Sequence, residues 1–370
     1  MSSAIRLLNV PIGNRAPDDL FEMFQCAIKL EHTTLPPYLT AMWSILDESN
    51  PAYEILETVV YEEMGHMGTV CNLLNAVGGP SPVIHDKDFV PHYPTKLPCD
   101  IAPKVICPNL IDWKISLSRL SPTVVSDIFM IIEYPEGEPV QVMEMAPRGT
   151  VPAAAAPMYY TIGEFYDAIR ETLIYLVGQN KIKIYPDQKQ ITALFGGHDE
   201  NGQNVVKPIN SLEDAVRSIE HIKEQGEGTT DTQDAPTFGC ELAHYYRFKQ
   251  IQVGQLYEQT DGGSWVLSGA LFDFPAVRRM ADIPADGYDP ATVPKEAATF
   301  IKNFNDNYKQ MLAQLQSAWE KGEKGGGQKD LRYAASYMNK LKADAVSLMS
   351  IPIDPKHPEK GCYGPTFRPF

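Results

Sequence analysis

The chain has 370 residues, of which 44% are hydrophobic and 21% are charged, and it carries a formal net charge of −15 and six cysteines. This length and apolar content predict a folded, enzyme-sized protein, and the negative charge excludes nucleic acid and membrane surfaces as main partners. No apolar run is long enough for a signal peptide or a membrane span, which predicts a cytoplasmic protein. The cysteines follow no metal-binding spacing and are expected to be free thiols.

The first predicted helix covers residues 18–43. Glu31 lies in the middle of its apolar stripe, which predicts that this acid faces a core. His32 is its neighbour on the helix circumference and is expected to lie beside a ligand or to face solvent, with metal binding as the alternative. Pro36 and Pro37 follow, and because prolines remove helix hydrogen bonds, the helix should kink or end just beyond the acid.

The second predicted helix covers residues 51–77 and forms an antiparallel hairpin with the first. Glu63 and His66 lie one helical turn apart on its apolar stripe. An uncompensated buried carboxylate costs several kcal/mol, as an order of magnitude, so the pair requires a cation or a dense hydrogen-bond network. Glu62 is a weaker candidate, because it is expected to lie beside the ligands or face solvent, with direct metal binding as the alternative.

A proline-rich connection covers residues 81–157 and contains one predicted helix at 121–132. We expect this connection to cap one end of the bundle and to help shape a pocket. The third bundle helix is predicted at residues 162–178. It offers Glu164 and Glu171, which are seven residues apart and therefore share a face, and Glu164 is slightly favoured as the inward acid.

A second insertion covers residues 179–208, and a further helix is predicted at 211–224. Glu227 follows between two glycines and is a candidate loop ligand, with a turn-stabilising or solvated role as the alternative. Glu241 and His244 then repeat the Glu-x-x-His spacing, which predicts a fourth bundle helix. Two such helices, each partnered by a helix with an inward glutamate, are typical of ferritin-like di-iron or di-manganese bundles.

The predicted fold is therefore all-α: a ferritin-like four-helix bundle with long irregular insertions and extra C-terminal helices. Residues 1–257 are expected to form the bundle, with insertions at about 81–157 and 179–208. Residues 258–370 are expected to add a turn-rich segment and two packing helices, 295–321 and 331–349, to the same globule.

The candidate metal ligands combine carboxylates and imidazoles, which suit two iron ions, with manganese as the alternative. They are Glu31, Glu62, Glu63, His66, Glu164, Glu171, Glu227, Glu241 and His244. Tyr166, Tyr245 and Tyr246 are candidate catalytic residues that would donate hydrogen bonds or electrons, with core packing as the alternative. The expected partners are a small-molecule substrate, dioxygen and an electron donor, and an oligomer is compatible with the sequence.

Five motifs stand out together, at residues 30–38, 62–66, 161–166, 225–228 and 241–248. They resemble the ferritin-like domain of the iminophenyl-pyruvate dimer synthase family, which includes the dimer synthases of violacein and rebeccamycin biosynthesis. The resemblance implies a ferritin-like fold and a role in specialised metabolism, on oxidised amino-acid-derived imines or related small molecules.

The leading interpretation is a non-haem di-metal oxidase or oxygenase. Two alternatives are a non-catalytic iron-binding, storage or scaffold protein, and a metal-independent imine-coupling enzyme. A storage cage would elute far above the size of a monomer or dimer. Metal-independent coupling would survive replacement of His66 and His244 by alanine.

Overall fold

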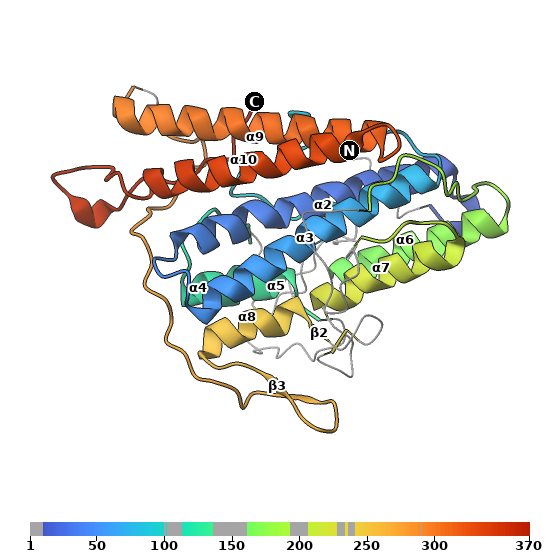
Figure 1. Ribbon diagram of the computed structural model, residues 1–370, viewed down its shortest axis with the longest axis horizontal. Helices are drawn as coiled ribbons and strands as arrows, with labels where there is room; N and C mark the ends of the chain where they lie inside the picture. Colours follow the sequence, from blue (N-terminus) through green and yellow to red (C-terminus); the bar gives the residue numbers. More distant parts are fainter. Residues whose placement is uncertain are drawn as a thin grey trace, which may run out of the picture.

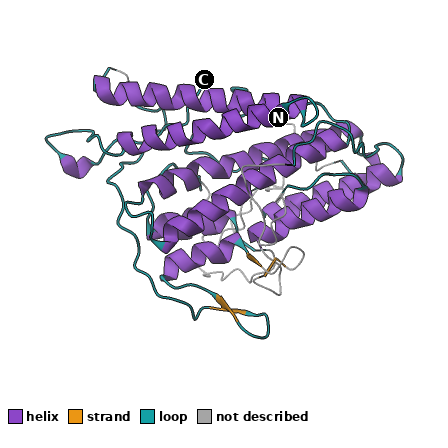
Figure 2. Cartoon of the chain, viewed as in Figure 1, coloured by secondary structure: helices purple, strands orange, loops and turns teal. Residues whose placement is uncertain are grey.

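The computed structural model describes residues 10–99, 101, 113–135, 161–192, 206–227, 234–235, 241–289 and 291–370, with only the backbone of residues 227, 234, 235 and 241. Its long helices lie in three layers (Figures 1 and 2). The middle layer is the hairpin of α2 (Pro17–Ser44) and α3 (Pro51–Ala76). One outer layer contains α9 (Lys295–Lys321) and α10 (Gly327–Leu348), and the other contains α6 (Ile162–Gly178), α7 (Leu212–Glu227) and α8 (His244–Val253).

Helix α2 continues through Pro36 and Pro37, so the expected break beyond Glu31 does not occur. In an unbroken helix the amide of residue 37 would donate to the carbonyl of Thr33, and proline has no such amide. The Tyr93 hydroxyl supplies the missing donor at 2.7 Å from the Thr33 oxygen. Tertiary packing therefore replaces one hydrogen bond that the sequence removes.

Helix α3 begins where its sequence predicts. The side chain of Asn50 accepts a hydrogen bond from the Ala52 amide, and Pro51 occupies the first helical position, where no amide is needed. The helix is 26 residues long and packs along α2 as an antiparallel partner. This hairpin presents one face to the α6–α8 layer and the other to α9 and α10 (Figure 1).

The helix predicted at residues 121–132 forms as three consecutive pieces: α4 (Pro122–Val124), the π-helical turn η2 (Val125–Phe129) and α5 (Met130–Ile132). Ser121 caps its start by accepting from the Val124 amide at 3.1 Å. A π-helical turn changes the angular position of every residue after it, and such turns are frequent at functional sites. The residue that follows α5 is Glu133, which is 3% exposed.

The second Glu-x-x-His pair does not lie on one helix, which corrects the predicted fourth bundle helix. Helix α8 begins at His244, and Glu241 belongs to the short strand β2 (Glu241–Leu242), which pairs with β1 (Asp234–Ala235). Ala243 between them has an extended backbone, with φ −61° and ψ 154°. The three-residue spacing therefore does not give Glu241 and His244 a common direction.

The C-terminal region adds the hairpin of β3 (Glu258–Gln259) and β4 (Trp265–Val266), then α9 and α10, and the short turn η4 (Pro358–Lys360). Side chains of α9 and α10 belong to the same hydrophobic core as those of α2 and α3. Helix α10 begins four residues before its predicted start at 331. The predicted division of the chain at residue 257 stays a prediction.

The cysteines are not all free thiols, which corrects that expectation. Cys26 on α2 is joined to Cys99 in a disulfide, whereas Cys71 and Cys362 are free. Cys107 and Cys240 lie outside the described residues. Among the described helices, none has the length and apolarity needed to cross a membrane.

Candidate metal centre

Three acids and two histidines converge between the α2–α3 hairpin and the α6–α8 layer. They are Glu31, Glu63, His66, Glu133 and His244, and none is more than 4% exposed. Among the described residues they form two groups whose potential ligand atoms lie within 4.8 Å of one another, and Glu63 belongs to both groups. Each group could hold a cation, and the Glu63 carboxylate is common to both.

The first group combines Glu31 of α2 with Glu63 and His66 of α3. His66 Nδ1 lies 3.5 Å from Glu31 Oε2 and 3.8 Å from Glu63 Oε1. On the other side of the ring, Nε2 lies 2.7 Å from Oε1 of Gln225 on α7. An amide oxygen only accepts, so Nε2 carries the proton and the lone pair of Nδ1 faces the two carboxylates.

The second group combines Glu63 with Glu133 and His244. His244 Nε2 donates to Glu62 Oε2 at 2.7 Å. Its Nδ1 lies 2.9 Å from Glu63 Oε1 and 3.8 Å from Glu133 Oε2, yet forms no hydrogen bond. Both histidines therefore direct Nδ1 at the acids while a side chain outside the group fixes the ring through Nε2, as in metal sites in general.

Each acid of the cluster has one oxygen bound by a hydroxyl group. Tyr166 donates to Glu31 Oε1, Tyr38 donates to Glu133 Oε1 at 2.7 Å, and Thr34 donates to Glu63 Oε2 at 2.9 Å. The second oxygen of each acid is the one that faces a histidine Nδ1. These hydroxyls orient the carboxylates and leave the inner oxygens available to a cation.

The residues present fit a pair of cations. Buried lone pairs of His66 and His244 face carboxylate oxygens, an arrangement that is repulsive unless a cation or a proton lies between them. Burial and neighbouring acids raise the pKa of Glu63 to about 8 and that of Glu133 to about 8. Three carboxylates and two imidazoles are the donors that iron, manganese and zinc accept.

Glu62 is not directed at the cluster, which corrects its place among the candidate ligands. One of its oxygens accepts from His244 Nε2, and the other accepts from Arg247 at 2.8 Å. Burial alone would raise the pKa of Glu62, but Arg247 and His244 hold it at about 2. Glu62 therefore stays ionised and orients the His244 ring.

The third bundle helix contributes Tyr166 to the cluster, and neither of its two predicted acids. Tyr166 is fully buried on α6 and binds Glu31. Residues two apart on a helix point about 200° apart, so Glu164 is partly exposed and lies in neither ligand group of the described residues. Glu171 shares the face of Glu164 and is exposed, so both predictions are corrected.

Two further predicted ligands, Glu227 and Glu241, have side chains outside the described residues, and their roles stay predictions. The predicted catalytic residues Tyr245 and Tyr246 lie in a small aromatic cluster. Their rings pack edge-to-face on each other, and Tyr246 also packs on Tyr257. This placement favours the packing alternative for both tyrosines.

The sequence interpretation missed Glu133 and the hydroxyl groups of Tyr38 and Thr34. Glu133 follows directly on an apolar helical run in the long connection. An acid at the end of such a run was the feature of the sequence that could have identified it. Thr34 is one turn beyond Glu31 on α2, and Tyr38 is one turn further. Helical spacing from the predicted ligand Glu31 could therefore have identified both Thr34 and Tyr38 as residues near the cluster.

Comparison with known proteins gives a consistent result. A family model described as ferritin-like matches residues 24–253, a range that contains every member of the cluster. A solved structure of a ferritin-like protein from Caulobacter vibrioides is 25% identical, with a TM-score of 0.61, and the match covers 90% of this chain and 95% of that chain. Comparison with curated proteins found no significant match. The predicted all-α, ferritin-like fold is confirmed.

Proposed function

The chain belongs to the ferritin-like family, and from this premise we propose that it is a non-haem di-metal oxidase or oxygenase. Iron is the proposed metal, with manganese as the alternative. Glu31 and His66 would hold one ion, Glu133 and His244 would hold the other, and Glu63 would bind both. Ferritin-like carboxylate bundles commonly bind two metal ions in this way.

The observation that carries the proposal is the position of Glu63 Oε1. This atom lies 2.9 Å from His244 Nδ1 and 3.8 Å from His66 Nδ1, so one carboxylate serves both groups. A single-ion site would not require a second histidine with an unbonded, buried Nδ1. Two cations satisfy both rings at once.

A bound pair of redox-active metal ions would supply electrons for the reduction of dioxygen. The chain's own residues hold and orient this pair. Tyr166, Tyr38 and Thr34 fix three carboxylates by hydrogen bonds, and Glu62 and Gln225 fix the two imidazoles. The cluster is buried, and Glu31, Glu63, His66 and Glu133 line a small pocket beside it.

The proposed substrate is a small amino-acid-derived molecule of specialised metabolism, and the support for this class is the sequence resemblance to dimer synthases. That relationship stays a prediction, as do dioxygen and an external electron donor as partners. A non-catalytic iron-binding protein would use the same ligands, so the test has to measure oxygen chemistry as well as metal content.

The test is anaerobic loading with Fe(II), followed by exposure to oxygen while oxygen consumption and visible absorption are recorded. The matched variants are Glu63→Gln and Glu171→Gln, because Glu171 is an exposed acid on α6. The proposal expects oxygen consumption by the wild type and Glu171→Gln, with at least a tenfold slower rate for Glu63→Gln. Two bound irons without oxygen consumption beyond that of free Fe(II) would reject the oxidase and favour an iron-binding role.

A further inference from the structure

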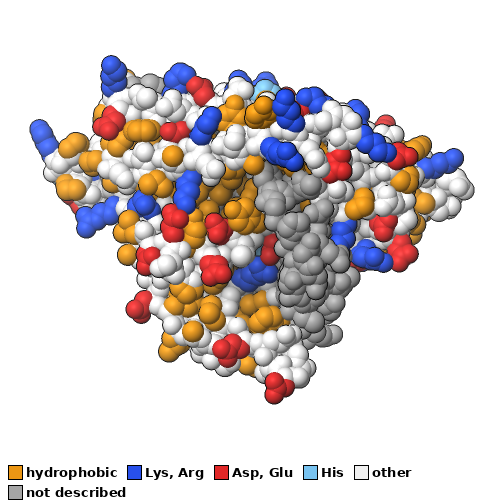
Figure 3. Space-filling model, viewed as in Figure 1, with side chains coloured by type: hydrophobic (Ala, Val, Ile, Leu, Met, Phe, Trp, Pro, Cys, Tyr) orange, Lys and Arg blue, Asp and Glu red, His pale blue; other side chains and the backbone are white. Residues whose placement is uncertain are grey.

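The opposite face of the α2–α3 hairpin carries a second pocket, covered by α9 and α10. Three of its residues each follow a member of the Glu–His cluster by one position: His32 follows Glu31, Met64 follows Glu63 and Met67 follows His66. Figure 3 shows hydrophobic side chains gathered beneath the α9–α10 layer on this side of the molecule. The hairpin therefore separates a cluster of acids and histidines on one face from a mostly apolar pocket on the other.

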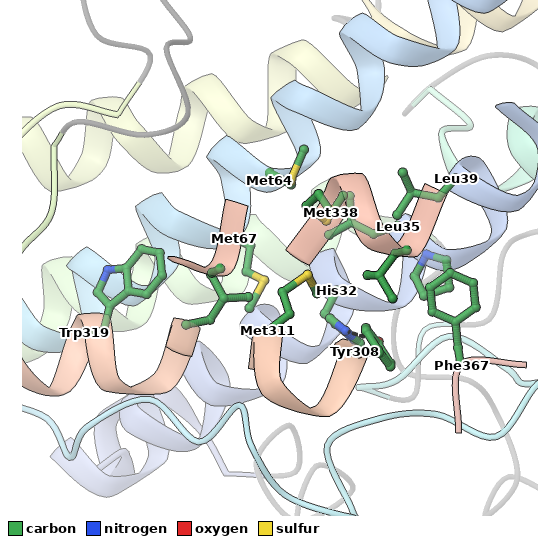
Figure 4. Close-up of a pocket in the computed structure, with 14 residues that line it drawn as sticks. His32, Leu35, Leu39, Met64, Met67, Tyr308, Met311, Trp319, Met338 and Phe367 are labelled. Carbon is green, nitrogen blue, oxygen red and sulfur yellow. Dashed lines mark hydrogen bonds between the residues drawn. The ribbon is translucent and has the colours of Figure 1, made fainter. Parts of the chain in front are cut away.

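The pocket is a slot lined mainly by apolar side chains. Its cavity volume is about 40 Å³, and the empty space reaches about 610 Å³ when the open mouth is included. Four of the 13 methionines of the chain line it: Met64, Met67, Met311 and Met338 (Figure 4). Methionine side chains adapt to a ligand's shape and make favourable sulfur contacts with aromatic rings.

One polar pair interrupts the apolar lining. His32 Nε2 lies 2.6 Å from the Tyr308 hydroxyl, and His32 Nδ1 is buried without a hydrogen-bond partner. A neutral imidazole and a phenol together carry two polar protons, and their mutual hydrogen bond uses one of them. If His32 carries its proton on Nδ1, this N–H has no acceptor among the described residues. If the proton is on Nε2, the Tyr308 O–H is the group that has no acceptor there.

Water alone is a poor occupant for this space. A buried water molecule needs two to four polar partners, and the slot offers a single unused donor among methionine, leucine and aromatic side chains. A slot lined by thioethers favours a planar ring instead. The unused donor requires a hydrogen-bond acceptor on that ring, such as a carbonyl oxygen.

We propose that the slot between the α2–α3 hairpin and α9–α10 binds a planar aromatic molecule that carries one hydrogen-bond acceptor, which the His32–Tyr308 pair recognises. The bound ring lies among the four methionines, and its acceptor receives the proton that the pair leaves unused. This site is separate from the Glu–His cluster, and the proposal does not depend on the oxidase function.

The test compares two probes of the same shape by isothermal titration calorimetry with the full-length, metal-loaded protein. Acetophenone carries a carbonyl oxygen, whereas α-methylstyrene has a methylene group in its place. The proposal expects both to bind, with acetophenone about twofold to tenfold tighter, the range of one net hydrogen bond. Absence of binding by acetophenone at millimolar concentration, or equal affinity of the two probes, would overturn it.

Two variants locate the binding site. Ala334 lines the slot and is fully buried, so Ala334→Leu fills the space and should reduce acetophenone affinity at least tenfold. Ala335→Leu, on the adjacent position outside the slot, should leave the affinity unchanged. The double variant His32→Phe/Tyr308→Phe should bind both probes equally, because it removes both polar protons of the pair. Unchanged affinity in Ala334→Leu would overturn the proposal even if this double variant does not fold.

Discussion

The two halves of the Glu–His cluster are built in different ways. Glu31, Glu63 and His66 lie in the interiors of α2 and α3, where helical spacing fixes their direction. Glu133 follows the last turn of a helix with a π-helical segment, and His244 is the first residue of α8. Periodicity in the sequence therefore predicts the first half, whereas the second half depends on where helices end in the folded chain.

The largest expected effect comes from the residue that joins the two halves. Glu63→Gln replaces a shared carboxylate by a neutral amide, so both ions should be lost and metal content should fall from about two per chain to near zero. Plasma mass spectrometry of the purified protein measures this. The control is Glu54→Gln, an exposed acid on the same helix. A variant that retains one full equivalent would show that Glu63 is not shared.

The next two variants test metal binding by each half of the cluster separately. Glu31→Gln and Glu133→Gln should each remove about one ion per chain, because each acid belongs to only one of the two groups. Metal content at matched loading is the measurement. If Glu133→Gln still holds two ions, Glu133 is not a required ligand of the second half. If the wild type itself holds one ion and Glu133→Gln retains it, the second half is not a metal site.

A smaller effect is expected from the side chains that orient the rings. Glu62→Gln should weaken metal binding at the His244 half by about 10–100-fold, the usual effect of losing such a partner. Gln225→Ala is the counterpart at the His66 half. Competition with a chelator of known affinity measures each. Unchanged affinity in Glu62→Gln would mean that the His244 ring needs no fixed orientation.

The metal-free protein should lose stability as pH rises from about 6.5 to about 8, above the range in which the lowered pKa values of the buried His32 and His221 act in the opposite direction. Burial raises the pKa of Glu63 and of Glu133 to about 8, above the value of 4.5 for an unfolded chain. The folded state therefore binds more protons than the unfolded state in this window, and stability falls as pH rises through it. Urea unfolding at both pH values measures this, and Glu63→Gln should reduce the slope. Stability that rises with pH would contradict the raised values.

The smallest effect concerns the continuity of α2. Tyr93→Phe removes the donor that bonds the Thr33 carbonyl opposite Pro37, and should cost about 1–2 kcal/mol of unfolding free energy. Tyr175→Phe is the control, because its hydroxyl bonds an exposed carbonyl, and it should change stability by less than about 0.5 kcal/mol. Equal losses in the two variants would show that Pro37 needs no substitute donor.

Sequence reasoning predicted most of the long helices because their apolar periodicity is strong. It failed where a tertiary contact decided the outcome: Tyr93 preserves α2 across Pro37, and a strand pair at Leu242 delays the start of α8. It also placed the inward residue of α6 at Glu164, although the phase of that helix turns Tyr166 to the cluster. Glu133 was missed because it lies just past the end of a helical run, where the preceding π-helical turn changes its angular position.

The central claim is that Glu63 lies between two metal ions. Anomalous diffraction at the iron absorption edge, from crystals of the iron-loaded protein, tests it directly. The account predicts two peaks, one beside Glu31 and His66 and one beside Glu133 and His244, with Glu63 contacting both. A single peak, or peaks elsewhere in the molecule, would contradict it.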